Sequence, residues 1–263
     1  MYPPMIDHDE AIAKFQQLLD PRTPYRFLRL FGEKDMGKTM LMTKVFPALA
    51  RHEDAAPVLI DMRSSQRPVD VMHTICHQLD LTHFRNFDRS YIQLFNMPRR
   101  GVQITGSVAM FASVKINNQP SDEDDVRHAQ PILTHNFFDD LRKWPGRTIV
   151  LLFDETDKAC TTAQNWLLDT LLGSLLLSKQ YTHVRVVVAG RQLPAHTGSY
   201  DSIRNNHTLR PVIEIEPYIR YCRAIGSTLT EDQILLLIKN SGYVLGVFAN
   251  TAKLLAPQGL SHD

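Results

Sequence analysis

The segment at residues 32–39, GEKDMGKT, constrains the fold of this chain more than any other part of the sequence. It has the spacing G-x-x-x-x-G-K-[ST], follows a short apolar run at residues 27–31 and precedes a helical pattern at residues 38–50. The glycines let backbone N–H groups close around a phosphate, and the N-terminus of the following helix adds positive potential. The segment therefore predicts a phosphate-binding loop between a strand and a helix.

This loop predicts binding of ATP or ADP together with Mg²⁺. Lys38 is expected to neutralise the β- and γ-phosphates, and the Thr39 hydroxyl is expected to bind the metal. The side chain of Met40, like that of Met42, is expected to pack against the sheet. The predicted nucleotide-binding residues are Gly32, Glu33, Lys34, Asp35, Met36, Gly37, Lys38, Thr39 and Met40.

A second motif, IVLLFDE at residues 149–155, is an apolar strand pattern that ends in two acids, the arrangement called Walker B. Asp154 is predicted to hold Mg²⁺ through water, as the second metal-binding residue beside Thr39. Glu155 is predicted to orient and deprotonate the attacking water, since hydrolysis requires an activated nucleophile. Asp157 competes with Glu155 for this catalytic role, and the residues alone leave both open.

A third motif, VVVAGR at residues 186–191, ends an apolar strand pattern with a glycine and a cation. Ligands of open α/β sheets bind beyond the carboxyl ends of the strands, so Arg191 can reach the predicted site and sense the γ-phosphate. A surface salt bridge is the alternative interpretation of Arg191.

Strand and helix patterns alternate along the chain and predict an α/β fold, a three-layer P-loop NTPase core with a parallel sheet of about five strands. The alternation breaks between about residues 82 and 125, where an aromatic segment precedes an apolar-polar alternation that predicts an inserted β-hairpin at about 100–118. After Pro217 the pattern is helical, with a helix start at Thr230. The expected domains are a core at 1–217 and a helical lid at 218–263. The five predicted strands lie at residues 27–31, 58–62, 148–153, 184–189 and 212–215.

Composition excludes several other classes of protein. The 263 residues are 43% hydrophobic, enough for a full core, and a net charge of +1 does not indicate a nucleic-acid binder, although a local basic patch stays open. The three cysteines and the histidines lie in no metal-ligand spacing, so no zinc site is expected. No window approaches the roughly 18 apolar residues of a membrane span, and we expect a cytoplasmic protein.

With these motifs in place, the chain resembles the bacterial signal-transduction ATPases with numerous domains (STAND), which are related to AAA+ proteins. The phosphate-binding loop, the segment LLFDETD, the following WLL helix, VVVAGR and the segment GYVLGVFANTAKLL at 242–255 carry the resemblance. It implies an AAA-like nucleotide core with a helical lid that acts as a slow switch, closed with ADP and able to oligomerise with ATP. The family's lid usually carries Gly-x-Pro, whereas this chain has Gly242-Tyr243-Val244.

The resemblance also implies partners, because the effector and sensor parts of such proteins are not visible in this sequence. The first functional hypothesis is therefore an ATP-binding switch, slowly hydrolysing, that signals through a homo-oligomer or through separate effector and sensor proteins, with bacterial defence as one setting. The second is an AAA+ ATPase regulator that acts on DNA in transposition or initiation. The third is a nucleotide-binding scaffold without hydrolysis. The sequence has no N-K-x-D motif for reading a guanine base, which argues against a Ras-like GTPase.

Overall fold

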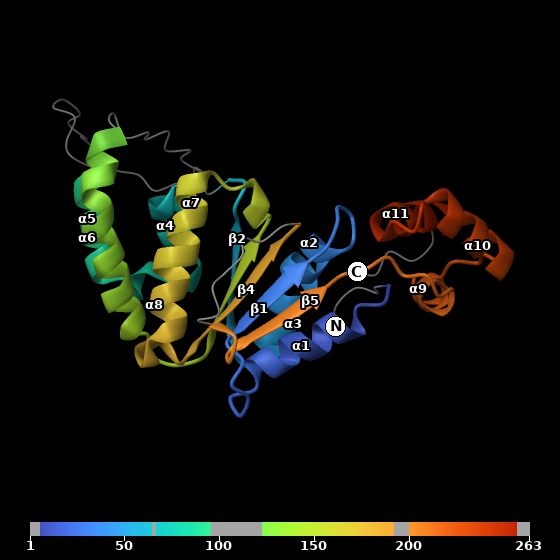
Figure 1. The fold of residues 1–263 in the computed structure, drawn as a ribbon, viewed down its shortest axis with the longest axis horizontal. Helices are drawn as coiled ribbons and strands as arrows, with labels where there is room; N and C mark the ends of the chain where they lie inside the picture. The colour runs from blue at the N-terminus through green and yellow to red at the C-terminus, as the bar shows by residue number, and fades with distance from the viewer. Residues whose placement is uncertain (1–5, 65–66, 96–122, 192–199, 257–263) are drawn as a thin grey trace, which may run out of the picture. The chain divides into compact units, whose positions relative to one another are not determined.

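The computed structural model describes residues 6–64, 67–95, 123–191 and 200–256 (Figure 1). Internal contacts divide the chain into two compact units, one formed by Met1–Arg67 with Gly146–Asp263 and one formed by Pro68–Pro145. In these described ranges, no helix is both long and apolar enough to cross a membrane.

The larger unit is built on a five-stranded sheet in the order β2-β3-β4-β1-β5, and every neighbouring pair is parallel. This arrangement confirms the predicted α/β fold and its sheet of about five strands. The apolar runs of the sequence form the four strands β1 to β4, because parallel strands covered on both faces are apolar throughout. The strands are β1 (Phe27–Phe31), β2 (Ala56–Asp61), β3 (Ile149–Asp154), β4 (Val184–Gly190) and β5 (Arg204–Thr208).

The prediction for the last strand was wrong. The strand expected at 212–215 is absent, and β5 is instead the preceding polar segment Arg204–Thr208, with the sequence RNNHT. As an edge strand, β5 pairs only with β1, and most of its side chains are not buried, so no apolar run marks it. The residues predicted as strand follow β5 in a connecting segment, where Val212 is buried and Ile213 is 75% exposed.

Alternate residues of the central strands face two different helical layers. Leu28 and Leu30 of β1 belong to a core that also contains Phe15 and Phe46, whose rings stack with centroids 4.1 Å apart. This layer consists of α1 (Asp9–Leu19) and the continuous helix α2 (Lys38–Met40), a π-helical stretch (Leu41–Val45) and α3 (Phe46–His52). The opposite layer runs through α7 (Thr161–Asn165), the π-helical stretch Trp166–Leu171 and α8 (Leu172–Leu177) (Figure 1).

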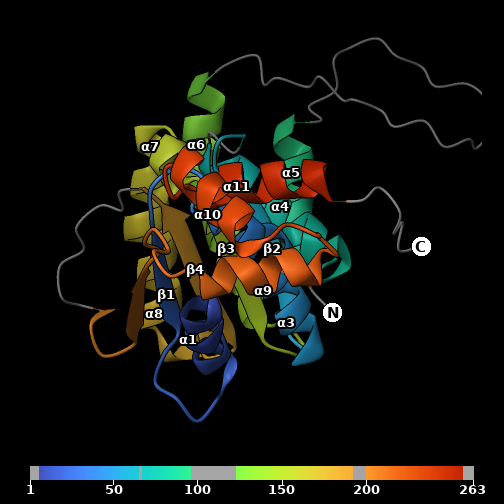
Figure 2. The same ribbon diagram turned by 90° about the vertical axis from the view of Figure 1, so that its right-hand side faces the viewer.

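Three helices follow β5 in the larger unit, and we refer to them together as the lid helices or lid: α9 (Glu216–Ala224), α10 (Glu231–Asn240) and α11 (Leu245–Leu255), orange to red in Figure 2. The predicted helix start at Thr230 is confirmed, because its side chain and that of Gln233 form a capping box. Tyr218 of α9 packs against Phe248 of α11, and its hydroxyl donates to the carbonyl of Val212 at 2.9 Å.

The smaller unit contains α4 (Pro68–Leu79), α5 (Arg85–Phe95) and α6 (Glu123–Arg142). Helix α5 lies in the aromatic segment to which the sequence assigned no helix. Its Phe87 packs edge to face against Phe137 of α6, and the buried Asp140 of α6 accepts the backbone N–H groups of Asn86 and Phe87 at 2.8 and 3.0 Å. Helix α6 begins in the acidic run at Glu123. The hairpin predicted at about 100–118 lies outside the described residues.

Stability of the larger unit should depend strongly on the aromatic stack between α1 and α3. Phe15 is fully buried, so Phe15→Ala is expected to lower the free energy of unfolding by about 3–5 kcal/mol. Leu254→Ala, at a side chain that is 79% exposed, should change it by less than about 0.5 kcal/mol. Urea unfolding of both variants measures the difference, and similar losses would contradict this packing.

Candidate functional site

The strand order brings the ends of the three sequence motifs to one edge of the sheet. Strand β4 lies between β1 and β3, and Phe31 at the end of β1 is in register with Gly190 at the end of β4. On the other side of β4, Asp154 at the end of β3 is in register with Asp61 at the end of β2. Since all strands are parallel, the loop after β1, the acids after β3 and Arg191 after β4 lie at the same carboxyl edge.

The loop between β1 and α2 has the backbone geometry of a tight turn. Gly37 stands directly before α2 with φ +86°, and Asp35 also has a positive φ of 63°. A Cβ atom on Gly37 would lie 2.4 Å from Nε2 of His8, so both the backbone and the space require glycine. Glu33, Lys34 and Asp35 are exposed, whereas Met36 is buried.

The Lys38 ammonium is buried at the base of this loop. Its Nζ donates to the carbonyl oxygens of Gly32 at 2.5 Å and Glu33 at 2.6 Å. Burial lowers the pKa of Lys38, while the carboxylates of Glu155, Asp157 and Asp154 oppose that shift. The predicted phosphate-binding cation and the three predicted acids therefore share one electrostatic environment.

The Thr39 hydroxyl lies close enough to Asp154, the other predicted metal-binding residue, to influence the pKa of its carboxyl. Asp154 is only 4% exposed, and burial raises the pKa of its carboxyl, although the Thr39 hydroxyl and the hydrogen bond from the backbone N–H of Glu155 oppose the rise. In the described residues no three His, Cys, Asp or Glu side chains gather as a metal site. A hydroxyl and a carboxylate nevertheless fit Mg²⁺, which commonly takes one or two protein ligands beside substrate phosphates.

The two candidates for the catalytic carboxylate have different partners. Glu155 lies in the left-handed region at φ 56°, and its carboxylate forms an ion pair with Lys158. Asp157 accepts the backbone N–H of Arg191 at 3.1 Å, which ties it to the end of β4. Both acids act on Lys38 electrostatically, so the geometry keeps both candidates beside the predicted phosphate site.

Arg191 stands just after β4 and its residue is exposed. Its charge lowers the pKa of Lys38, as the smallest of the effects that act on this pKa after burial and the three carboxylates. The alternative interpretation of Arg191 was a surface salt bridge. Among the described residues, its side chain forms no such ion pair.

Asp61, at the end of β2, is a site residue that the sequence motifs did not indicate. It raises the pKa of Asp154 slightly, after larger effects from burial and Glu155, and the backbone N–H of Met62 donates to the Asp154 carbonyl at 3.1 Å. The bidentate hydrogen bonds of Arg63 lower the pKa of Asp61. The sequence signal that could have indicated Asp61 is its position at the end of an apolar strand pattern.

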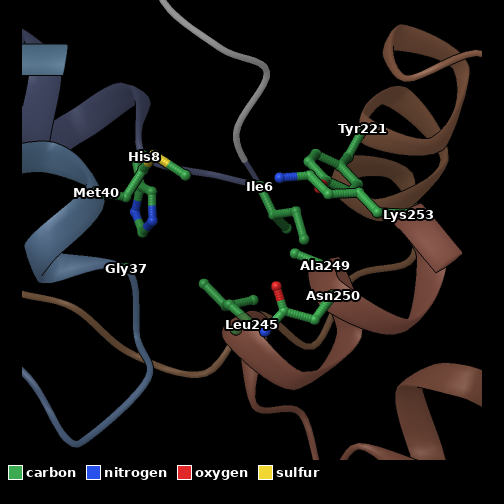
Figure 3. Close-up of a pocket in the computed structure, with 10 residues that line it drawn as sticks. Ile6, His8, Gly37, Met40, Tyr221, Leu245, Ala249, Asn250 and Lys253 are labelled. Atoms are coloured by element: carbon green, nitrogen blue, oxygen red, sulfur yellow. The ribbon is translucent and has the colours of Figure 1, made fainter. Parts of the chain in front are cut away.

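A cavity of about 130 Å³ opens beside Gly37, between the start of the chain and the lid (Figure 3). Leu245 and Ala249 of α11 and Ile6 contribute apolar walls, and Met40 lines it from α2. The lid also contacts the loop directly, because the N–H of Gly246 donates to the Asp35 carbonyl at 2.9 Å. The remaining lining residues are His8, Gly37, Tyr221, Gly246, Asn250 and Lys253.

Apart from Gly37 and Met40, five lining residues lie in the segment at 242–255 that carries the family resemblance, whereas Ile6, His8 and Tyr221 belong to no sequence motif because they are far apart in the chain. Gly246 offered one retrospective signal, since a glycine in the first turn of a helix is unfavourable. A Cβ atom there would lie 3.2 Å from the Asp35 Cβ and 3.3 Å from its carbonyl oxygen. The glycine permits the close contact between lid and loop.

Comparison with solved structures supports the fold. Cdc6p of Pyrobaculum aerophilum superposes with a TM-score of 0.56 at 16% identity, over 97% of this chain and 61% of that chain. A Walker-type ATPase of Pyrococcus abyssi matches with a TM-score of 0.49 at 12% identity, over 96% of this chain and 69% of that one. No protein-family model and no curated protein matches the sequence. The chain thus has the α/β fold of P-loop NTPases and spans less than two thirds of the Cdc6p chain.

His8, which packs against Gly37, should make the protein sensitive to acid. Burial, followed by the neighbouring His207, lowers the pKa of His8 to about 4, against a weaker opposing effect of Asp9. The unfolded chain takes up the proton near pH 6.5, so stability should fall between pH 6.5 and 4, by about 3 kcal/mol from this group.

His8→Leu should therefore lose less stability than the parent over that range, with little difference in slope above pH 6.5. Urea unfolding at a series of pH values measures both slopes. Part of the slope is expected to remain in the variant, because burial also lowers the pKa of His207. Identical slopes in the two proteins would show that His8 is not buried in its neutral form.

Proposed function

We propose that this chain binds ATP or ADP with Mg²⁺ and acts as a nucleotide-dependent switch. The observation that carries the proposal is the complete phosphate-loop sequence at residues 32–39, placed between β1 and α2 with Lys38 buried beneath it. The three nearby carboxylates, the Thr39 hydroxyl and the adjacent cavity support it. Together they offer separate places for phosphates, metal and base.

The residues of the chain have distinct proposed tasks in binding. Backbone N–H groups of the loop and the start of α2 hold the phosphates, and Lys38 exchanges its two carbonyl partners for phosphate oxygens. Thr39 and Asp154 would hold Mg²⁺, whose positive charge would offset that of the phosphates. The cavity beside Gly37 receives the base, and Arg191 contacts the γ-phosphate.

Hydrolysis, in this proposal, is slow and uses one carboxylate after β3. Glu155 is the first choice, because it directly follows the metal-binding Asp154. To act as a base it must leave its ion pair with Lys158, and this step offers one reason for slow turnover. Asp157 is the competing residue, held by the backbone N–H of Arg191.

The lid supports a switching role. Its helix α11 lines the cavity and is hydrogen-bonded through Gly246 to Asp35 of the phosphate loop. A nucleotide that occupies both places changes the contacts of the lid, and signalling would follow through self-assembly or separate partner proteins, as in the STAND proteins. The division into a core at 1–217 and a lid at 218–263 is part of this proposal.

Lys38→Ala is expected to weaken ATP binding by roughly a hundredfold, because the variant loses the buried cation that faces the phosphates. Lys44→Ala, at an exposed lysine further along the same helix, is the matched control and should bind ATP like the parent. Isothermal titration of both variants with ATP and Mg²⁺ measures the effect. Unchanged affinity in Lys38→Ala would overturn the proposed nucleotide site.

Glu155→Gln is expected to retain ATP binding and to lose turnover by about two orders of magnitude, the usual scale for loss of a general base. The ATP-bound variant should also form larger oligomers than the parent in light scattering, if ATP drives assembly. Retained turnover in Glu155→Gln with loss in Asp157→Asn would assign the catalytic role to Asp157. A parent protein that binds ATP without turnover would favour the scaffold function.

A further inference from the structure

The carboxylate proposed as the catalytic base is held by a neighbouring cation. Lys158 forms an ion pair with Glu155 across one turn of the short helix Thr156–Lys158, which follows β3. The side chain of Glu155 is 20% exposed and that of Lys158 is 39% exposed, so the pair lies near the surface. An ammonium partner stabilises the charged form of a carboxylate and makes it a poorer acceptor for a proton from water. The proposed hydrolysis therefore needs Glu155 without this partner.

A second acid lies close to the same cation. Asp61 ends β2 and is in register with Asp154, the residue before Glu155. The backbone N–H of the residue after Asp61 donates to the Asp154 carbonyl at 3.1 Å, which joins the loops after the two strands. The charge of Lys158 lowers the pKa of Asp61, after the larger effect of the hydrogen bonds from Arg63. Two carboxylates on neighbouring loops thus lie in the field of one ammonium group.

Arg63 holds Asp61 in place at the end of β2. Its backbone N–H and its Nε each donate to Oδ1 at 3.0 Å, and Nη2 donates to Oδ2 at 2.7 Å. The Asp61 side chain is nevertheless 38% exposed, so an ammonium group can still approach it. Because Arg63 already offsets part of the charge of Asp61, the unpaired Glu155 is the stronger partner for Lys158 in this structure.

We propose that Lys158 restrains hydrolysis by holding Glu155, and that Asp61 is a positioning residue that draws Lys158 away and frees the base. The inference rests on the proposed function, because it assumes that Glu155 activates the attacking water. A lysine suits this exchange, since its compact charge sits on a flexible four-carbon stem and can move between two acids without a change of the backbone.

The exposure of the ion pair sets the size of the effect. A partly exposed ion pair is weak, so its removal should increase the population of free Glu155 by about two- to fivefold. Salt screens such a pair, so added salt should act in the same direction as removal of Lys158. The restraint is therefore partial and slows turnover without abolishing it.

The first experiment measures ATP hydrolysis by the whole chain and three lysine variants. Lys158→Met should raise kcat about two- to fivefold with little change of KM, because the substitution affects the base and not the binding of ATP. Lys158→Arg keeps the positive charge and should have a kcat at or below that of the parent. Lys179→Met is the matched control, since Lys179 is exposed before β4, at the opposite edge of the sheet, and should behave like the parent.

The second experiment tests Asp61 through a double-mutant cycle. Asp61→Asn alone should lower kcat, because Lys158 then has only Glu155 as a partner. In the Lys158→Met background the same substitution should leave kcat unchanged, since the cation that Asp61 draws away is absent. Raising sodium chloride from about 0.05 to about 0.5 M at saturating ATP should raise kcat of the parent and leave that of Lys158→Met unchanged. Urea unfolding of the variants without nucleotide should differ little from the parent, as expected for a partly exposed ion pair.

The outcomes separate this inference from the proposed function. A kcat of Lys158→Met at or below that of the parent, with Glu155→Gln inactive, would overturn the restraint and leave Glu155 as the base. Additive effects of the Asp61 and Lys158 substitutions would remove the positioning role of Asp61.

Full turnover in Glu155→Gln would contradict both the inference and the catalytic assignment of Glu155, while nucleotide binding would still be judged by the Lys38→Ala titration. A parent that binds ATP without turnover, and whose Lys158→Met variant is equally inactive, would refute the inference and favour the scaffold function. A parent that does not bind ATP would refute both proposals.

Discussion

Parallel pairing of β4 with both β1 and β3 is the constraint on which the candidate site depends. Because β4 is buried along its whole length and lies between the other two strands, the separation between the phosphate loop and the acids after β3 is set by the sheet. The Thr156 hydroxyl strengthens this arrangement by donating to the Ala189 carbonyl of β4 at 2.9 Å. Site residues at the ends of paired strands are held more precisely than residues on long loops.

Most of the sheet could be predicted from the sequence, because its central strands carry local signals. The runs at β1, β3 and β4 are apolar except for Arg29, the terminal Asp154 and Arg185, and the phosphate loop has its own spacing. Strand β5 has neither signal, since the polar sequence RNNHT is held by one neighbour at the edge of the sheet. Helix α5 was missed for a similar reason: its start is stabilised by Asp140, which lies 53 residues from Phe87 in the sequence.

The candidate site was predictable to the same degree. Lys38, Thr39 and Asp154 lie in motifs whose residue types and spacing state their chemistry, and the structure brings them together. The cavity was not predictable, because two of its lining residues, His8 and Tyr221, are far apart in the sequence and line the same cavity only in the folded protein. The sequence interpretation gave His8 no role, although the residue is buried against Gly37 and this burial lowers its pKa.

Under the proposed function, the cavity and the phosphate loop contribute differently to switching. A ligand shifts a conformational equilibrium only through a difference in its affinity for the two states. ATP and ADP carry the same base, so the cavity would control whether a nucleotide is bound but could not distinguish the two nucleotides by direct contact. That distinction must come from groups near the γ-phosphate, which are Lys38 and Arg191 in this chain.

The contact between lid and loop is suited to transmit such a distinction. Gly246 and Asp35 are joined by one backbone hydrogen bond, worth only about 1 kcal/mol net, and Asp35 already has a positive φ. A small rearrangement of the loop around a γ-phosphate can therefore break the bond at low cost, whereas the apolar walls of α11 would keep the lid on the base. The lid would then respond to the phosphates by changing its orientation while the nucleotide remains bound.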